Sequence, residues 1–267
     1  MKQFYGKKIL VTGAANGIGR LMALAFAGRG ADVIVTDLNA AGAEKVAAEI
    51  LAIGRQAWFY GLDVANLDAI HTFRQQIRHD IGKIDGLVNN AGVVFGGAFE
   101  MEPLEKHLLT YQVNISGLVA LTHTFFSDLL AGSDSALVNI ASAAGYVGLP
   151  FGSTYSSSKW AVLGFAESIR LELAERELNQ LSVMTVCPGY INVGQFAGVS
   201  RPRLMPFLEA DALAERIVQG IEQKESLIRE PFLVKAIGLA RVLPVPLADW
   251  TSRRLGLTRS MSRWRSR

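Results

Sequence analysis

Tyr155 and Lys159 are a pair of residues whose types and spacing could do chemistry. They stand four residues apart at the head of a long amphipathic segment, so on a helix both side chains would project from one face. A phenol ionises at about pH 10 in water, and an adjacent ammonium favours the phenolate, which can then transfer a proton near neutral pH. Ser142, after the apolar segment ALVNIA, could donate a hydrogen bond to a reacting oxygen. The same spacing occurs by chance on solvated helices, so the surrounding elements must support this interpretation.

A glycine-rich turn near the N-terminus is typical of a nucleotide-binding site. Residues 8–11 form a short, mainly apolar run, TGAANGIG follows at 12–19, and a helical pattern then runs through Gly28. Glycines let the backbone approach a pyrophosphate, and free N–H groups and the helix dipole favour its negative charge. A tight strand-to-helix turn without a ligand would have the same sequence. The candidate binding residues of the turn are Gly13, Asn16, Gly17, Ile18 and Gly19.

Asp37 bears on which nicotinamide cofactor the chain would bind. It follows a second predicted strand, residues 31–36, and lies eighteen residues beyond Gly19. A carboxylate there can accept hydrogen bonds from both ribose hydroxyls of an adenosine and would repel a 2′-phosphate. NAD is therefore expected rather than NADP, and Arg20 is the nearby basic residue that weakens this expectation. A loop carboxylate that caps the next helix would look the same.

Helical and strand patterns alternate along the rest of the chain. Predicted helices are residues 40–53, 67–81, 103–130, 153–178 and 210–223, and predicted strands are residues 56–60, 86–88, 136–140, 182–186 and 227–229. This alternation predicts an α/β fold, a Rossmann-type doubly wound parallel sheet with helices on both faces. Ligands of such sheets bind beyond the carboxyl ends of the strands. Polar or glycine-containing segments stand at those ends, after each of the first six predicted strands.

The order of these motifs resembles the short-chain dehydrogenase/reductase family over about residues 5 to 230. The motifs are TGAANGIG, Asp63-Val64, the NNAG segment at 89–92, Asn114, Ser142 and the YSSSK segment at 155–159. The resemblance implies that Tyr155 is the general acid/base and that Lys159 lowers its pKa and holds the nicotinamide ribose. It further implies that Ser142 polarises the substrate oxygen and that Asn114 positions a water in the proton relay.

The same resemblance implies a set of further cofactor contacts at the strand ends. These residues are Asp63, Val64, Asn90, Ala91, Gly92, Pro188, Gly189 and Ile191. One departure from the family pattern is Val193, which stands where a threonine commonly hydrogen-bonds the nicotinamide carboxamide. Asn192 is a candidate substitute for that contact.

Composition restricts the class of protein. The chain has 267 residues, half of them hydrophobic, which suits one large α/β domain or two small ones. Its single cysteine, Cys187, excludes an internal disulfide framework and is expected at a buried strand end. The four histidines lack metal-ligand spacing, so no metal site is expected.

The chain lacks sequence signals for secretion, membrane spanning or nucleic-acid binding. MKQFYGKKILVTG has no apolar signal-peptide core, and no segment has eighteen uninterrupted apolar residues. The net charge of +3 comes without the aromatic interleaving typical of nucleic-acid binding. A cytoplasmic protein without a nucleic-acid partner is expected.

Residues near the expected substrate pocket are mostly apolar or aromatic, with no arginine or lysine among them to bind a carboxylate or phosphate. They are Val94, Phe95, Ala144, Tyr146, Val147, Leu149, Phe151, Tyr190 and Phe196. This lining favours a lipophilic alcohol or ketone, although the same residues could pack on their own scaffold. The loop at residues 193–207 is the expected mobile lid.

Composition changes beyond residue 230. Residues 231–267 carry eight Lys or Arg and one Asp, a net of +7 that leaves −4 for the rest of a chain whose total is +3. We therefore expect a catalytic domain at residues 1–230 and an apolar, then basic, extension at residues 231–267. The extension could lie on an anionic membrane, cover a partner subunit or pack over the chain's own cleft. Similar extensions occur in family members that act on retinoids, steroids and other lipids.

Two other functions share these motifs: reduction of 3-oxoacyl thioesters, and NAD binding by a non-catalytic sensor or scaffold. The absence of a basic clamp weighs against the first, and the complete set of proton-transfer groups weighs against the second. By resemblance, the helices at residues 103–130 and 153–178 are expected to pair across a two-fold axis in a homodimer or homotetramer.

Overall fold

The strands of the protein are short apolar segments that pair in parallel into one sheet. The computed structural model describes residues 1–191, 206–238, 242–254, 256, 258 and 261. Within them the strand order is β3-β2-β1-β4-β5-β6-β7, and neighbouring strands are parallel. The strands are β1 (Lys8–Thr12), β2 (Asp32–Asp37), β3 (Ala57–Gly61), β4 (Gly86–Asn89), β5 (Ser135–Ile140), β6 (Leu181–Pro188) and β7 (Leu227–Glu230). The Val-, Ile- and Leu-rich central strands suit burial on both faces.

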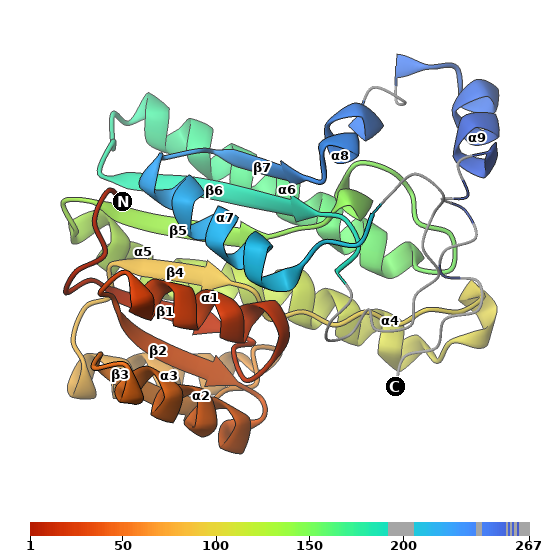
Figure 1. Ribbon diagram of the computed structural model, residues 1–267. Helices are drawn as coiled ribbons and strands as arrows, with labels where there is room; N and C mark the ends of the chain where they lie inside the picture. The colour runs from red at the N-terminus through yellow and green to blue at the C-terminus, as the bar shows by residue number, and fades with distance from the viewer. Residues whose placement is uncertain (192–205, 239–241, 255, 257, 259–260, 262–267) are drawn as a thin grey trace.

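Helices cover both faces of the sheet. One face carries α1 (Gly17–Gly28), α2 (Ala40–Ala52) and α7 (Ala210–Glu222); the other carries α3 (Leu67–Asp80), α4 (Leu104–Tyr111), α5 (Leu118–Ala131) and α6 (Ser153–Glu175). Figure 1 shows the first set in front of the sheet and the second behind it. The chain winds outward from β1 to β3 and then in the other direction from β4 to β7. The predicted doubly wound α/β fold is confirmed, and its switch point lies between β1 and β4.

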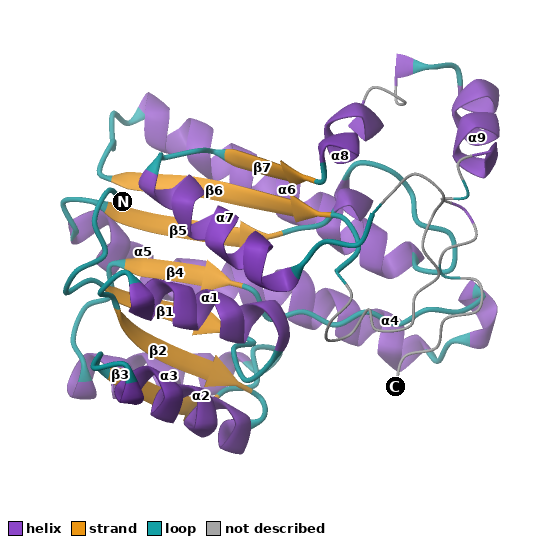
Figure 2. Cartoon of the chain, in the orientation of Figure 1, coloured by secondary structure: helices purple, strands orange, loops and turns teal. Residues whose placement is uncertain are grey.

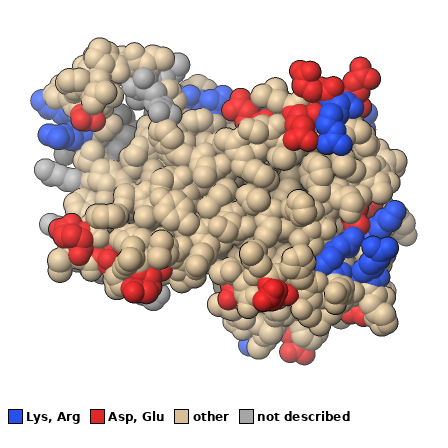
Figure 3. All heavy atoms as spheres, turned by 180° about the vertical axis from the view of Figure 1, so that it is seen from behind, with Lys and Arg blue, Asp and Glu red and all other residues tan. Residues whose placement is uncertain are grey.

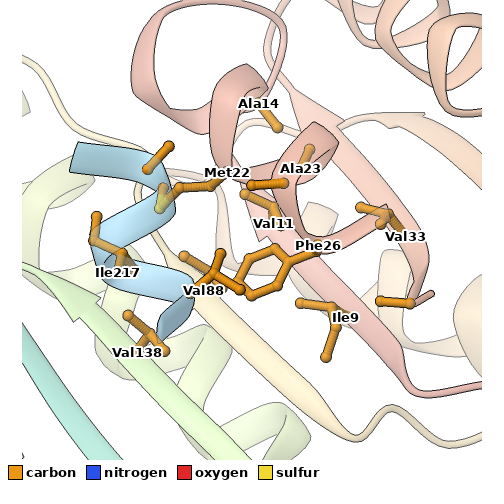
Figure 4. Packing of buried hydrophobic residues seen from close by; sticks show 14 of the residues in the cluster. Ile9, Val11, Ala14, Met22, Ala23, Phe26, Val33, Val88, Val138 and Ile217 are labelled. Atoms are coloured by element: carbon orange, nitrogen blue, oxygen red, sulfur yellow. The ribbon is translucent and has the colours of Figure 1, made fainter. Parts of the chain in front are cut away.

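Each face of the sheet has its own apolar core. On the α1 side, Met22 and Phe26 project from the helix toward Val11, Val88 and Ile217 (Figure 4). A second cluster fills the space between the sheet and α3, α5 and α6. Fully burying a side chain of this kind stabilises a fold by about 1.5–3 kcal/mol. These contacts hold the strands in register, so the loops at their carboxyl ends start from a rigid edge.

The predicted helix at residues 103–130 is not regular along its length. A π-helical turn, Gln112–Gly117, separates α4 from α5. Such a turn contains one residue more than an α-helical turn and is often found at functional sites. A Cβ at Gly117 would lie 2.3 Å from the backbone oxygen of Val64, so this turn needs a glycine to pack there. By length and composition Leu104–Ala131 could cross a membrane, but here it packs against α3, α6, β4 and β5.

Two short helices follow β7. Together α8 (Phe232–Ile237) and α9 (Val245–Arg254) form a lobe beyond the carboxyl ends of β6 and β7, at the upper right of Figure 1. Val234 of α8 is buried against Ala143, whereas none of the residues of α9 is buried. Small loop helices lie at Phe99–Met101 and Ala143–Gly145. Apart from residues 206 and 207, the predicted lid at 193–207 lies outside the described residues.

Candidate active site

The carboxyl ends of the parallel strands border one cavity of about 360 Å³. Figure 2 shows why this edge gathers the loops, because the strand arrows all point toward it. Its lining includes every predicted catalytic or cofactor residue except Asn114, namely Gly13, Asn16, Gly17, Ile18, Gly19, Asp37, Asp63, Val64, Asn90, Ala91, Gly92, Ser142, Tyr155, Lys159, Pro188, Gly189 and Ile191. Residues far apart in the sequence therefore meet in one place.

The glycine-rich turn is shaped to let a ligand approach the backbone. Gly13 has a φ of 63°, and a Cβ at Gly19 would lie 2.1 Å from the Gly13 oxygen. Asn90 fixes the turn, since its side-chain amide donates to the oxygens of Thr12 and Gly13, both at 2.9 Å. At the start of α1, Asn16 makes no side-chain capping hydrogen bond. The first N–H groups of this helix suit the pyrophosphate of a dinucleotide.

Asp37 connects the end of β2 to the glycine-rich turn. One carboxylate oxygen accepts from the N–H of Ala15 and the other from the N–H of Asn39, each at 2.9 Å. Arg20, the cation that weakens the expectation of NAD, is paired with Glu49 of α2. Its Nε donates to Glu49 Oε1 at 3.2 Å, and a second guanidinium nitrogen contacts Oε2. The positive charge of Arg20 thus already has a carboxylate partner.

Tyr155, Lys159 and Ser142 meet at the inner end of the cavity. The Lys159 ammonium lies 5.7 Å from the centroid of the Tyr155 ring and donates a hydrogen bond to the Ile140 oxygen at 2.9 Å. Ser142 hydrogen-bonds with the Tyr155 side chain, and its Oγ accepts from the N–H of Ala144 at 3.1 Å. Both Tyr155 and Lys159 are buried. A phenol, a hydroxyl and an ammonium in this arrangement can exchange a proton with a substrate oxygen.

Burial dominates the proton affinities of this group. It raises the pKa of Tyr155 above its ordinary value, and the hydrogen bond with Ser142 offsets only part of the effect. Burial also lowers the pKa of Lys159 to about 8. The sequence predicts a lowered pKa for Tyr155, because it reveals the neighbouring cation but not the desolvation of the phenol. Here the phenol is held in its protonated form.

Asn114 lies beside the cavity rather than in its lining. Its Oδ1 accepts from the N–H of Val93 at 2.8 Å, and its Nδ2 donates to the Val93 oxygen at 2.9 Å and to Ser158 Oγ at 3.0 Å. It therefore joins the loop after β4 to α6, the helix of Tyr155. The π-helical turn brings this amide to that loop. Its predicted role with a relay water stays a prediction.

The predicted substrate residues divide into groups. Val94 and Ala144 pack with Tyr155 in an apolar cluster, with Leu149 and Tyr190 at its edge. Tyr146 and Val147 pack near Val234 of α8 instead, the Phe95 ring faces the ammonium of Lys106, and Phe151 is exposed. Phe196, Asn192 and Val193 lie outside the described residues.

Several residues that shape the site are not singled out by sequence reasoning. The Thr12 hydroxyl accepts from the N–H groups of Asn90 and Ala91 at 3.1 and 3.0 Å, which ties β1 to the loop after β4. Val93 and Val113 line the cavity. Thr12 begins the TGAANGIG segment, but a buried hydroxyl leaves no periodic signal in a sequence. An apolar loop residue such as Val93 has none either.

The remaining candidates for chemistry are Cys187 and the residue types that bind metals. Cys187 is buried at the end of β6, as predicted, and burial raises its pKa to about 12, which makes it a poor nucleophile. Among the residues that the structure describes, no group of three or more His, Cys, Asp or Glu side chains could hold a metal ion.

Known proteins share this sequence pattern. A sequence profile described as short chain dehydrogenase matches residues 7–203. The chain belongs to the short-chain dehydrogenase family. Estradiol 17-beta-dehydrogenase 11 of Homo sapiens is 32% identical over 247 residues, covering 91% of this chain and 81% of the relative. Epidermal retinol dehydrogenase 2 of Mus musculus is 31% identical over 252 residues, covering 91% and 80%.

Solved structures of family members have the same fold. A metagenomic short-chain oxidoreductase in complex with NADP is 29% identical, with a TM-score of 0.72 over 84% of this chain and 95% of that one. A short chain dehydrogenase/reductase from Burkholderia phymatum in complex with NAD is 22% identical, with a TM-score of 0.80 over 91% and 95%. Nicotinamide cofactors of both kinds thus occur among proteins of this fold.

Family membership confirms the predicted class of reaction. The protein is an oxidoreductase that acts on CH–OH groups with a nicotinamide cofactor. The relatives are steroid and retinol dehydrogenases by name, so they favour neither a thioester reductase nor a non-catalytic sensor. The solved structures contain NADP in one case and NAD in the other, so they do not show which of the two cofactors this protein prefers.

Proposed function

We propose that the protein is an NAD-dependent dehydrogenase or reductase of lipophilic primary or secondary alcohols and ketones, with Tyr155 as its general acid/base. The main support is that one cavity is lined both by Tyr155, Lys159 and Ser142 and by the glycine-rich turn and Asp37. Binding and proton-transfer groups thus border the same space. The residues 1–230 would form the catalytic domain, with residues 231–267 as its extension.

The chemistry divides between cofactor and protein. A bound nicotinamide supplies or accepts the hydride. In ketone reduction, the Tyr155 phenol donates its proton to the substrate oxygen while Ser142 donates a hydrogen bond to the same oxygen. In alcohol oxidation the Tyr155 phenolate takes the proton back, and the Lys159 ammonium stabilises that anion. Because burial raises the pKa of Tyr155, the phenol stays protonated at neutral pH, and oxidation, which needs the phenolate, should speed up as pH rises.

The acid/base role is tested by Tyr155→Phe. We expect this variant to lose turnover, because a phenyl ring has no proton to exchange, while retaining NAD binding. Tyr111→Phe is the matched control, since it also removes a phenolic hydroxyl, one that hydrogen-bonds Ser157 on the protein surface. Initial rates with NADH and a lipophilic ketone, together with NADH titration by fluorescence, measure the two properties separately. A Tyr155→Phe variant with near-normal kcat would refute the assignment.

The preference for NAD is supported by the charges around the adenosine end of the cavity. Asp37 would face the ribose hydroxyls, and Glu49 neutralises a nearby cation, Arg20. Glu49→Gln should free the guanidinium and lower KM for NADP relative to NAD by roughly tenfold, about the effect of one partly screened charge. Glu44→Gln, which changes an exposed carboxylate of the same helix, is the control. If the ratio of KM for NADP to KM for NAD were the same in both variants, the pairing of Glu49 with Arg20 would not support a preference for NAD.

A lipophilic substrate is supported by the apolar surroundings of Tyr155. Val94 and Ala144 are buried beside it, and Leu149 and Tyr190 are at the edge of the same cluster. The relatives are named for estradiol and retinol, which are both lipophilic alcohols. A hydrophobic wall of this kind selects by shape and apolar area rather than by charge.

A peripheral membrane contact of the lobe is part of the proposal. Phe232 and Trp250 are exposed on it, each with a cation over its ring: Lys235 at 5.5 Å and Arg254 at 5.3 Å from the ring centroids. Figure 3 shows basic side chains on this lobe, at its upper left. Exposed aromatic residues beside cations suit the interface of an anionic bilayer. The expected cytoplasmic location agrees with such a contact and stays a prediction.

Flotation with liposomes tests this contact. Wild-type protein should float with vesicles that contain phosphatidylserine, and Trp250→Ser should float less. Phe99→Ser, which removes an exposed aromatic side chain outside the lobe, is the control. Equal flotation of all three proteins would dispose of the membrane contact.

A homodimer or homotetramer is also part of the proposal. The rear face, seen in Figure 3, carries few charged side chains at its centre. Leu108 of α4, Val119 of α5 and Leu171 of α6 are exposed, and these helices cover the rear side of the sheet. Light scattering at micromolar concentration measures the subunit count, and Leu171→Asp should shift it toward the monomer.

A further inference from the structure

Met261 is completely buried although it lies beyond the last described helix, in the basic end of the chain. It packs in one apolar cluster with Val94, Ala144 and Tyr155, with Leu149 and Tyr190 partly buried at the edge. Here it takes a place beside the phenol that exchanges the proton.

The partners of Met261 come from separate strand ends. Val94 follows β4, Ala144 follows β5 and Tyr190 follows β6. Each of these loops also borders the cavity or flanks a residue that does. Met261 therefore belongs to an apolar cluster around Tyr155 whose other members come from several separate segments of the chain.

A second contact of the extension supports the same placement. Val234 of α8 is fully buried against Ala143, the residue that follows Ser142, and Tyr190 lies next to it as well. The extension thus meets the loops on the substrate side of the site at two separate positions. Its packing there does not depend on Met261 alone.

The geometry limits where a substrate can lie. The oxygen of an alcohol must reach Tyr155, so the carbon groups attached to its carbinol carbon must contact the apolar side chains around that phenol. Tyr155 is only 5% exposed, which leaves little free space on this side. We propose that Met261 is a substrate-specificity residue that limits the size of the apolar group held beside Tyr155.

This inference rests on the proposed function, since it takes Tyr155 as the proton-exchanging group. Methionine suits such a wall because its unbranched side chain adapts to irregular apolar shapes. Removing its outer atoms should make room for a larger ring system, and adding volume should exclude it. A change in the size of a hydrophobic pocket alters selectivity by roughly 10-fold to 200-fold per methylene group.

The test compares cyclohexanol with its fused two-ring homologue, decalol. In Met261→Ala, the ratio of kcat/KM for decalol to that for cyclohexanol should rise at least about tenfold, and in Met261→Phe it should fall. Met261→Leu nearly conserves volume and should keep the ratio within about twofold. Met101→Ala is the matched control, because Met101 is exposed on the surface.

A structural role alone predicts a different result. If Met261 only anchored the chain terminus, Met261→Ala would change kcat/KM for both alcohols by the same factor, and an unchanged ratio overturns the inference. Should Met261→Ala fail to fold, Met261→Phe tests the size limit from the opposite direction. Calorimetric affinities of cyclohexanone and decalone for the NADH-bound protein should follow the same order in the same variants. Absence of turnover in the wild type would refute the proposed function, while those affinities would still test Met261.

Discussion

Replacing Lys159 by methionine should make the protein more stable at neutral pH and much less active. Lys159 is buried, and burial lowers its pKa from an ordinary 10.5 to about 8. A difference of this size between folded and unfolded states corresponds to about 3 kcal/mol, since each pKa unit is about 1.4 kcal/mol. Below pH 8 the ammonium is charged in both states, so the folded protein bears this full cost.

Methionine keeps most of the side-chain volume and removes the charge. It also leaves the Ile140 oxygen without the hydrogen bond that Lys159 donates at 2.9 Å, a loss of about 1 kcal/mol. The expected gain in the free energy of unfolding at pH 7 is therefore about 2 kcal/mol. The proposed mechanism accounts for this cost, because it uses the charge of Lys159 in proton transfer.

The pH dependence has a definite sign. Because the unfolded chain binds the Lys159 proton more tightly than the folded protein does, this residue's contribution to stability rises with pH between about 8 and 10.5. The advantage of Lys159→Met should therefore shrink over that range and reverse above it, where the lost hydrogen bond to Ile140 leaves the variant about 1 kcal/mol less stable than wild type. Urea unfolding at pH 7 and near pH 10 measures the difference between variant and wild type at each pH. The surface variant Lys83→Met is the control.

Two results would refute this reasoning. A Lys159→Met variant no more stable than wild type at pH 7 would mean that the ammonium is well solvated or fully compensated. A gain of equal size at both pH values would mean that packing, and not charge, is responsible.

Two further predictions concern the turn and the buried ion pair. Gly19→Ala should weaken NADH binding at least about tenfold in a fluorescence titration, because the added Cβ would lie 2.1 Å from a backbone oxygen of the turn. Gly28→Ala is the control in the same helix: its added Cβ would meet no atom within 4 Å, so this variant should bind NADH normally. Asp128→Asn should lower the free energy of unfolding by about 3–5 kcal/mol, because the carboxylate is buried and accepts bonds of 2.6 and 2.8 Å from Arg74. Glu172→Gln, in an exposed ion pair, should cost less than about 1 kcal/mol. Similar losses in both carboxylate variants would contradict the role of burial.

Sequence patterns predict most of this fold because each central strand is an apolar run and the long helices that cover the sheet each have a buried stripe. The doubly wound arrangement could be predicted as well, since alternating elements have few ways to wind a parallel sheet, whereas the strand order comes from the structure. The candidate residues converge on one cavity because they stand at strand ends, and parallel strands end at the same edge. These are properties of spacing, which a sequence displays directly.

The unpredicted features depend on contacts between distant segments. The direction of the pKa shift at Tyr155 depends on how deeply the phenol is buried, and the pairing of Arg20 with Glu49 depends on how α1 and α2 lie together. The π-helical turn depends on Gly117 meeting the Val64 backbone. The burial of Met261 could not be read from a terminal segment that is basic on both sides of it.

The π-helical turn also limits how this stretch can be edited. Each residue of an α-helix advances the chain by about 100° around its axis, so deleting one residue from Gln112–Gly117 would swing the whole outer face of α4 relative to α5. The additional residue rotates the faces of α4 relative to those of α5, so the two helices can pack against different surfaces. A design that transfers Leu104–Ala131 to another scaffold must keep the additional residue of the turn together with Asn114, because otherwise the Asn114 amide will not face the loop that holds Val93.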